Sequence, residues 1–193
     1  MTSNSIIIDN FLEEEYFAEL QSIIMGEGQQ AQNPNQFSWF YGGDVISKGY
    51  RDDKQKSEYE AEKLYLFTHL FYLHDVPQSP MFDLVVPFVN AINNIKQKTE
   101  WGGYRIKSLI RIRANFFGNT PTLHDHQMHT DFEFPHTAAV LSLNTCDGYT
   151  KIADGTKLDS IANRVVFFDA GEEHCATSTT SMKNRFNIIV NYL

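Results

Sequence analysis

The chain has 193 residues, of which 42% are hydrophobic and 21% are charged, so it is long enough for one packed domain and too apolar for a disordered one. It contains no run of about 20 apolar residues, which argues against a membrane-spanning helix. Sixteen basic and 24 acidic side chains give a net charge of −8, and a surface of that sign repels nucleic acid. We therefore expect neither a membrane nor a nucleic acid as a partner.

The termini and the cysteines indicate the compartment. The first ten residues lack the basic flank and the apolar segment of a secretory signal. The two cysteines, Cys146 and Cys175, are too few for the disulfide scaffold of a small secreted protein. These features predict a cytoplasmic protein.

A short strand and an amphipathic helix are predicted at the start of the chain. Residues 6–8 are three isoleucines, and the segment after them repeats apolar side chains at helical spacing. Asn10 and Glu13 stand three positions apart, as in a capping box, so we expect the helix to begin there. Gly26 is expected to end it.

Residues 26–60 are rich in glycine, asparagine, glutamine and charge. A segment of this length is too long for a simple connection, so it is expected to be a functional lid or a partly ordered loop. The aromatic stretch Trp39–Gly43 is the candidate for the covering part, although packing of Trp39 in the core is the stronger expectation. Further along, residues 64–74 predict a strand and residues 81–98 a helix, kinked at Pro87.

The pattern changes after Trp101. Short apolar runs follow one another at spacings of roughly eight to twelve residues, separated by Gly, Asn, Asp or Ser, which is typical of an antiparallel sandwich such as a jelly roll. We therefore predict one mainly β domain over residues 1–193. Residues 1–100 would form its helical support and lid region, and residues 101–193 its jelly-roll core. Four cations near the start of this core are expected to lie on a solvated strand face: Arg105, Lys107, Arg111 and Arg113.

Histidines gather beside aspartates near the start of this region. His129 and Asp131 are separated by one residue and so share one face of a strand; with one distant histidine they would form the 2-His-1-carboxylate triad of non-haem iron. His124 and His126 have the same spacing, and would suit a three-histidine metal site. Three other histidines are expected to be structural or solvated: His69, His74 and His136.

Two residues near the C-terminus bear on this choice. His174 is the only histidine beyond position 136, and so is the distant ligand of either set. Arg185 follows it at the start of an apolar run, where a buried guanidinium needs an anion and can bind a carboxylate through two hydrogen bonds. The alternative is an ordinary cation that reaches solvent from a strand end.

These motifs together resemble a known family. The His129-x-Asp131 pair, the later His174 and Arg185, and the opening IIIDNFLEEEYFAEL resemble Fe(II)- and 2-oxoglutarate-dependent oxygenases, in particular the short prolyl 4-hydroxylase-like forms of bacteria and phages. The similarity is strongest over residues 126–192. It implies a double-stranded β-helix, or jelly-roll, core.

The resemblance also implies roles for individual residues. His129, Asp131 and His174 would bind the iron, and Arg185 would bind the distal carboxylate of 2-oxoglutarate, where many members carry lysine. His126 stands where members often have a tyrosine that contacts the same carboxylate. A further co-substrate contact is expected from one more residue: Asn115.

The implied activity is a dioxygenase reaction, the hydroxylation of an unactivated C–H bond. It would use Fe(II), with 2-oxoglutarate and O₂ as co-substrates and ascorbate as a reductant. The substrate would be a peptide or protein, prolyl residues included, or a small molecule. Two alternatives remain: a cupin-like metalloenzyme that uses His124, His126 and His174 without 2-oxoglutarate, and a non-catalytic jelly-roll binding module. Of these three, the oxygenase alone requires Arg185 as a buried cation.

Overall fold

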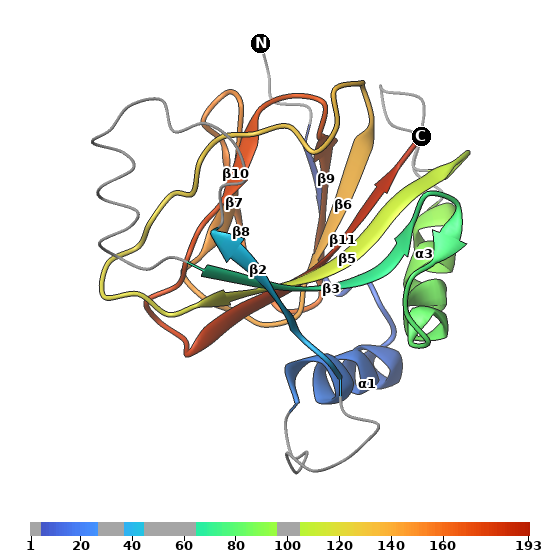
Figure 1. Ribbon diagram of the computed structural model, residues 1–193, viewed down its shortest axis with the longest axis horizontal. Helices are drawn as coiled ribbons and strands as arrows, with labels where there is room; N and C mark the ends of the chain where they lie inside the picture. The colour runs from blue at the N-terminus through green and yellow to red at the C-terminus, as the bar shows by residue number, and fades with distance from the viewer. Residues whose placement is uncertain (1–4, 27–36, 45–64, 96–104) are drawn as a thin grey trace.

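The computed structural model describes residues 5–26, 37–44, 65–95 and 105–193. Its strands form two antiparallel sheets that curve around a common interior (Figure 1). The large sheet has the order β1 (Ile6–Ile8), β9 (Arg164–Asp169), β6 (Thr137–Ser142), β11 (Asn184–Tyr192), β5 (Leu109–Gly118), β3 (Tyr65–Leu73) and β2 (Phe40–Asp44), with β4 (Val76–Pro77) paired to β3. The small sheet has the order β10 (His174–Ala176), β7 (Tyr149–Ile152) and β8 (Lys157–Asp159). The predicted mainly β, jelly-roll architecture is confirmed.

The first hundred residues contribute strands as well as helices. β3 pairs with β5 over most of its length, and β1 pairs with β9, so this region extends the large sheet in addition to supporting it. The predicted strands over residues 6–8 and 64–74 are confirmed. Most of the expected lid, residues 26–60, lies outside the described residues. Of its aromatic stretch, Trp39 is partly buried against the rings of Phe116 and Phe186, as a core residue.

Helix α1 (Glu14–Met25) ends at Gly26, whose left-handed backbone (φ 72°) confirms the predicted stop. The predicted capping box is wrong, because the helix begins one turn later and Glu13 makes no side-chain cap. Instead, the chain turns at Asn10 (φ 50°), and the amide of Asn163 holds the backbone of Leu12 by two hydrogen bonds, of 2.9 and 2.8 Å. A contact from a distant loop therefore replaces the local cap.

Pro87 marks a junction between two helical segments. The short 3₁₀-helix η1 (Phe82–Val85) leads directly into α3 (Val86–Asn93), with Pro87 in the first turn of α3. Proline is favoured there because its fixed φ suits a helix start and its missing N–H needs no partner. The expected kink is therefore a change of helix type. No helix in the described segments is long and apolar enough to cross a membrane.

The strands that carry the interior have two differently used faces. In β5, Ile112 and Ala114 point to the apolar core beneath α1 and α3, and in β11, Ile188 and Val190 do the same. Because side chains alternate along a strand, the intervening positions point into the interior between the two sheets. These positions are mostly polar or charged: Arg111, Arg113, Asn115, Arg185, Asn187 and Asn191.

Candidate metal centre and its pocket

His129 and His174 are joined by a reciprocal pair of backbone hydrogen bonds. The N–H of each residue donates to the carbonyl of the other, at 2.9 Å in both directions. His174 is the first residue of β10, and His129 lies in the irregular segment between β5 and β6. This short bridge brings two residues that are far apart in the sequence to the same end of the small sheet.

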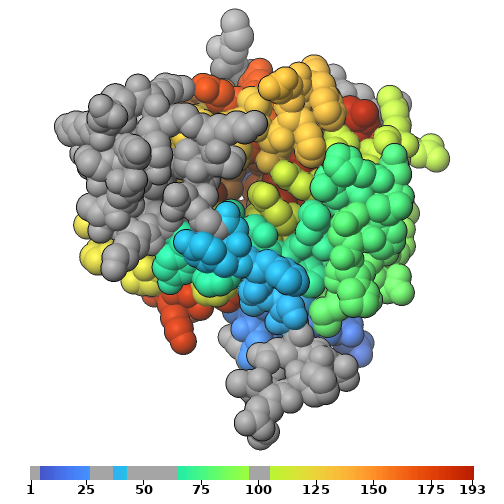
Figure 2. All heavy atoms as spheres, viewed as in Figure 1, coloured from blue at the N-terminus to red at the C-terminus, as the bar shows by residue number. Residues whose placement is uncertain are grey.

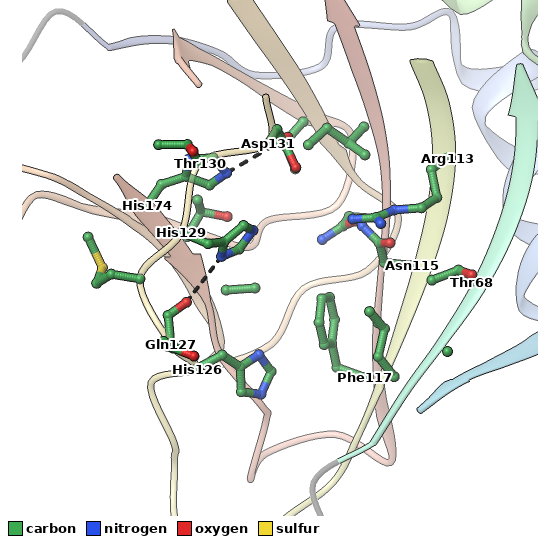
Figure 3. A pocket seen from close by; sticks show the side chains of 18 of the residues that line it. Thr68, Arg113, Asn115, Phe117, His126, Gln127, His129, Thr130, Asp131 and His174 are labelled. Carbon is green, nitrogen blue, oxygen red and sulfur yellow. Dashed lines mark hydrogen bonds and ion pairs between the residues drawn. The ribbon is translucent and has the colours of Figure 1, made fainter. Parts of the chain in front are cut away.

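The same local geometry orients both imidazoles. Nδ1 of His129 donates to the carbonyl of Gln127 at 3.1 Å (Figure 3), and Nδ1 of His174 donates to the carbonyl of Glu172 at 3.0 Å. A carbonyl only accepts, so the proton of each neutral ring is on Nδ1 and the lone pair of Nε2 stays available. Hydrogen bonds of this kind fix the tautomer and direction of metal-binding histidines. Burial lowers the pKa of His174, which favours its neutral form.

Asp131 lies between these histidines and a pair of polar side chains. Arg111 donates to its Oδ1 at 2.5 Å, and the Asn191 amide donates to its Oδ2 at 2.8 Å. Nε2 of His174 is 3.8 Å from the same Oδ2. Burial alone would raise the pKa of Asp131, but the charge of Arg111 and its hydrogen bond outweigh burial and hold that pKa well below its usual range. The carboxylate is therefore ionised.

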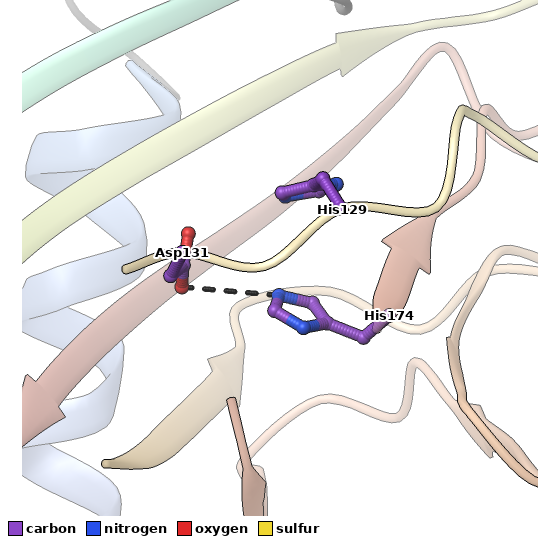
Figure 4. A group of neighbouring side chains, drawn as sticks. All are labelled: His129, Asp131 and His174. Carbon is purple, nitrogen blue, oxygen red and sulfur yellow. Dashed lines mark ion pairs between the residues drawn. The ribbon is translucent and has the colours of Figure 1, made fainter. Parts of the chain in front are cut away.

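Two neutral imidazoles and one carboxylate are a donor set that suits a divalent iron. Their ligand atoms lie within 4.8 Å of one another and converge on one point (Figure 4). Two donors on one face of a metal, with bonds of about 2.1 Å at roughly right angles, are about 3 Å apart, so side-chain rotations that move the ligand atoms by about 1–2 Å would close the set. The residues present therefore fit a metal held on one face, with its other positions open to the pocket.

The alternative histidine set is not brought together. Nε2 of His124 is 2.8 Å from the hydroxyl of Thr122. His126 is buried against the ring of Phe117, with ring centroids 5.3 Å apart. Within the described segments, the group formed by His129, Asp131 and His174 is the one cluster with metal-ligand spacing.

A pocket of about 650 Å³ opens beside the three ligands. Its floor comes from β5 and β11 and its far wall from β7 and the segment before β6. On the face shown in Figure 2 the surface is hollowed next to β2, drawn in light blue. Pockets of this size hold small organic ligands, so there is room for a co-substrate and part of a second molecule.

Arg185 lies directly behind one end of this pocket. It is 1% exposed, so the alternative of a cation that reaches solvent is wrong. Its guanidinium donates to two hydroxyls and one carbonyl, and it lies over the ring of Phe117, which lines the pocket. One of the hydroxyls, that of Thr150 at 3.2 Å, also lines the pocket. Burial lowers the pKa of Arg185 to about 10, so the group is charged at neutral pH, and no carboxylate of the described residues pairs with it.

The two weaker sequence predictions also lie in the pocket wall. His126 is buried, its Nδ1 has no hydrogen-bond partner, and burial together with the nearby Arg185 lowers its pKa to about 3. It is therefore a neutral ring next to the buried cation. Asn115 donates to Asn187 at 2.9 Å, and its own Oδ1 is buried without a partner.

The histidines expected to be structural include His69, which contacts the Ser38 carbonyl and the Ser79 hydroxyl.

Three features of the site do not follow from motif spacing. Arg111 and Arg113 face the pocket, so the predicted solvated strand face is wrong for them. Their signal in the sequence is a cation at every second position of an apolar strand. Gly148 is the third feature: a Cβ there would lie 2.7 Å from Cδ of Arg185 and 2.6 Å from the Ser178 carbonyl oxygen.

Comparisons with known proteins give a structural likeness only, because no family model and no curated protein matches the chain. A 2OG-Fe(II) oxygenase family oxidoreductase from Burkholderia pseudomallei superposes with a TM-score of 0.64 at 8% identity, over 98% of this chain and 85% of that one. A prolyl-4-hydroxylase from Pseudomonas putida gives 0.58 at 15% identity, over 99% and 93%. A Trichoplax adhaerens prolyl hydroxylase, in complex with a hypoxia inducible factor peptide fragment, gives 0.51 at 14% identity, over 100% and 84%. The chain has the jelly-roll fold of the 2-oxoglutarate- and iron-dependent oxygenases.

Proposed function

We propose that this protein is an Fe(II)- and 2-oxoglutarate-dependent dioxygenase that hydroxylates its substrate. The observation that carries the proposal is Arg185, a buried cation without a counter-charge among the described residues, behind one end of the pocket that the three candidate ligands line. A metal site alone does not require such a cation. A dicarboxylate that chelates the metal with one end and meets a guanidinium with the other does.

Each residue has a defined task in this reaction. His129, Asp131 and His174 hold the metal from one side and leave the pocket side open. Arg185 and the neutral His126 bind the distal carboxylate of the co-substrate, and Asn115 supports the co-substrate from β5. Iron bound there supplies the activation of O₂, and 2-oxoglutarate is converted to succinate and carbon dioxide as the C–H bond is oxidised.

The substrate is less constrained than the co-substrate. Two of the similar structures are prolyl hydroxylases, one of them with a bound peptide, which supports a prolyl-hydroxylase-like reaction on a peptide, protein or related small molecule. A prolyl side chain presents unactivated C–H bonds of the kind that this chemistry oxidises. Ascorbate would serve to keep the iron reduced.

The test is thermal unfolding under nitrogen with and without Fe(II) and 2-oxoglutarate. Ligand linkage predicts that 2-oxoglutarate raises Tm in the presence of the metal, by about 2.7 kcal/mol of stability at a hundred times its dissociation constant. Glutarate, which lacks the chelating keto oxygen, should give a smaller shift. A rise in Tm by 2-oxoglutarate that is equal with and without metal, or no rise at all, would contradict the proposal.

In air, the same protein should release succinate from 2-oxoglutarate, because slow uncoupled turnover needs no substrate. The matched control is His129→Ala, which removes one ligand at an exposed position and should therefore leave the fold intact. Metal binding without any response to 2-oxoglutarate would favour the cupin-like alternative.

A further inference from the structure

Arg113 is a second cation of the pocket without a partner. Its side chain points from β5 into the pocket (Figure 3), and it makes no hydrogen bond or ion pair with any described residue. Its Nε is fully buried and unpartnered. Arg185, by contrast, makes three hydrogen bonds to protein oxygens.

The charged groups that face Arg113 do not neutralise it. Arg111, on the same strand, repels it, and both oxygens of Asp131 are already bound by Arg111 and Asn191. Burial, aided by Arg111, lowers the pKa of Arg113 to about 10, so the guanidinium stays charged at neutral pH. The Arg113 side chain is partly exposed to the pocket, but its Nε is fully buried without a partner. A charge in such a place is costly without a counter-ion, so this part of the pocket favours an anion.

The co-substrate does not supply that anion. Under the proposed function, on which this inference rests, one carboxylate of 2-oxoglutarate binds the metal and the other meets Arg185. The guanidinium of Arg185 lies over the ring of Phe117. Phe117 is four residues from Arg113 on the same strand, which corresponds to about 13 Å between their Cα atoms. Arg113 and Arg185 therefore belong to separate anion subsites.

The neighbour of Arg113 on the pocket face further restricts the chemical class of the ligand. Asn115 is two residues along the strand; under the proposed function its amide N–H supports the co-substrate, and its Oδ1 is still a buried acceptor without a donor. A ligand with a carboxylate and an adjacent N–H donor satisfies both groups at once. We propose that Arg113 binds the carboxylate of the substrate itself, and that the substrate is a small carboxylic acid of the free α-amino acid class.

The experiment uses full-length protein loaded with Fe(II) and 2-oxoglutarate under nitrogen. The probes are the free protein amino acids, each compared with its own carboxamide, which removes the negative charge and keeps the side chain. Binding is measured as the rise in Tm and then as a dissociation constant by titration. Arg113→Met removes the charge and keeps an apolar stem, Arg113→Lys keeps the charge without the fork, and Arg105→Met is the matched control at an exposed position.

At least one free amino acid should bind where its carboxamide does not. Arg113→Met should weaken that binding by about thirtyfold or more, as expected for a buried charge pair that loses one member. Arg113→Lys should fall between, and Arg105→Met should match the parent protein. The affinity for 2-oxoglutarate should be the same in all four proteins.

Four results would overturn the inference. Carboxamides that bind as well as the acids, or no binding by any acid while 2-oxoglutarate binds normally, would remove the substrate class and leave the oxygenase proposal intact. A tenfold loss of 2-oxoglutarate affinity in Arg113→Met would assign this guanidinium to the co-substrate. No 2-oxoglutarate binding by the parent protein would defeat the oxygenase proposal and this inference together. If Arg113→Met does not fold, the acid and amide comparison on the parent protein and Arg113→Lys still decides.

Discussion

Nη2 of Arg111 lies 2.5 Å from Oδ1 of Asp131, so a candidate iron ligand is also half of a buried ion pair. The two carboxylate oxygens have different partners, since Oδ2 receives the amide of Asn191 and is the one that lies 3.8 Å from Nε2 of His174. This division keeps Oδ1 on Arg111, while Oδ2 has a second lone pair beside the Asn191 hydrogen bond that can bind a metal. Arg111 thereby holds the carboxylate in a monodentate orientation, with its own Nε anchored on Asn191 at 3.1 Å.

Arg111→Met should destabilise the metal-free protein and increase its response to metal. Breaking a buried pair costs about 3 kcal/mol, because Asp131 is left without a counter-charge. Loss of the orienting contact weakens metal binding tenfold to a hundredfold, about 1.4–2.7 kcal/mol. Removal of a positive charge roughly 5 Å from a divalent metal strengthens binding by about 7 kcal/mol at an effective dielectric constant of about 20. Electrostatics therefore prevails, all the more because Asn191 still orients the carboxylate.

The measurement for Arg111→Met is thermal unfolding with and without Mn(II), a redox-stable substitute for iron. The metal-induced rise in Tm should be larger in the variant than in the parent protein, with Arg105→Met as the control for loss of an arginine. A smaller rise would show that Arg111 acts mainly by orientation.

The ligand set itself is tested by comparing the distant His174 with His124, a histidine of the sequence cluster. His174→Ala should abolish metal binding, because it leaves two ligands where three hold the ion on one face. His124→Ala should leave it intact, because Nε2 of His124 lies against the Thr122 hydroxyl, outside the group. For both variants, the metal content after gel filtration is measured by atomic spectroscopy. Loss of metal in both variants would restore the three-histidine alternative, because His174 belongs to that set as well.

Gly148→Ala should impair co-substrate binding from outside the pocket. The added Cβ would meet the Ser178 carbonyl at 2.6 Å and Cδ of Arg185 at 2.7 Å, and a backbone atom cannot rotate away. Arg185 is therefore displaced, and we expect at least a tenfold loss of 2-oxoglutarate affinity with metal binding retained. The control is Gly155→Ala, which strains a backbone with φ 89° in open space and costs about 1 kcal/mol of stability. Equal 2-oxoglutarate affinities in the two variants would contradict a positioning role for Gly148.

Residue spacing along the chain predicted the metal ligands, but not which side chains surround them in the pocket. A residue pair one position apart shares a strand face whatever the rest of the fold, so His129 and Asp131 could be paired from the sequence. The direction of that face could not be predicted. β5 is buried on both sides, apolar toward the helices and charged toward the pocket, and a cation at every second position looks the same when it faces water. Only the pairing of β5 with β3 and β11 places Arg111 and Arg113 inside.

Local signals also failed where a long-range contact replaced them. The capping box expected from Asn10 and Glu13 is sound local chemistry, yet the start of α1 is held by Asn163, which lies far away in the sequence. The left-handed turn at Gly26 needed no such partner, because glycine adopts it freely, and there the prediction was confirmed.

Asp147 should make stability depend on pH in the acid range. It accepts hydrogen bonds from Thr179, Thr180 and Ser181, in the turn that connects Thr177 to β11. Burial raises its pKa, but these hydrogen bonds outweigh burial and hold it well below the ordinary 3.8. A lowered folded-state pKa contributes stability that is present at neutral pH and is lost as the pH falls from that value toward the folded-state pKa.

Asp147→Asn should therefore cost about 1 kcal/mol at pH 7, the net value of a hydrogen bond to a partly exposed group. The difference from the parent protein should narrow below pH 3.8. Urea unfolding at pH 7 and pH 3 measures it. A difference that stays constant with pH would mean that the charge of Asp147 is not what the turn recognises.

Arg185 carries the claim that 2-oxoglutarate is the co-substrate, so its replacement is the most direct test. A guanidinium in a dry pocket wall binds a carboxylate through two parallel hydrogen bonds. Loss of one member of such a pair costs about 2–5 kcal/mol, or roughly thirtyfold to several thousandfold in affinity. Arg185→Ala should therefore raise the 2-oxoglutarate requirement steeply while metal binding survives, because none of the three ligands contacts the guanidinium. Arg185→Lys should be milder, since it keeps the charge and loses the fork.

The readout is 2-oxoglutarate titration under nitrogen, followed by the metal-to-ligand absorption band, with metal content measured in parallel. Arg164→Ala is the control, because that arginine is paired with Asp9 outside the pocket lining and its loss removes an ion pair without touching the site. Unchanged affinity in Arg185→Ala would place the distal carboxylate elsewhere, with Arg113 as the remaining unpaired cation of the pocket. A variant that binds metal normally, loses 2-oxoglutarate and regains part of it as lysine would identify position 185 as the co-substrate anchor, because a defect in folding would not follow the charge.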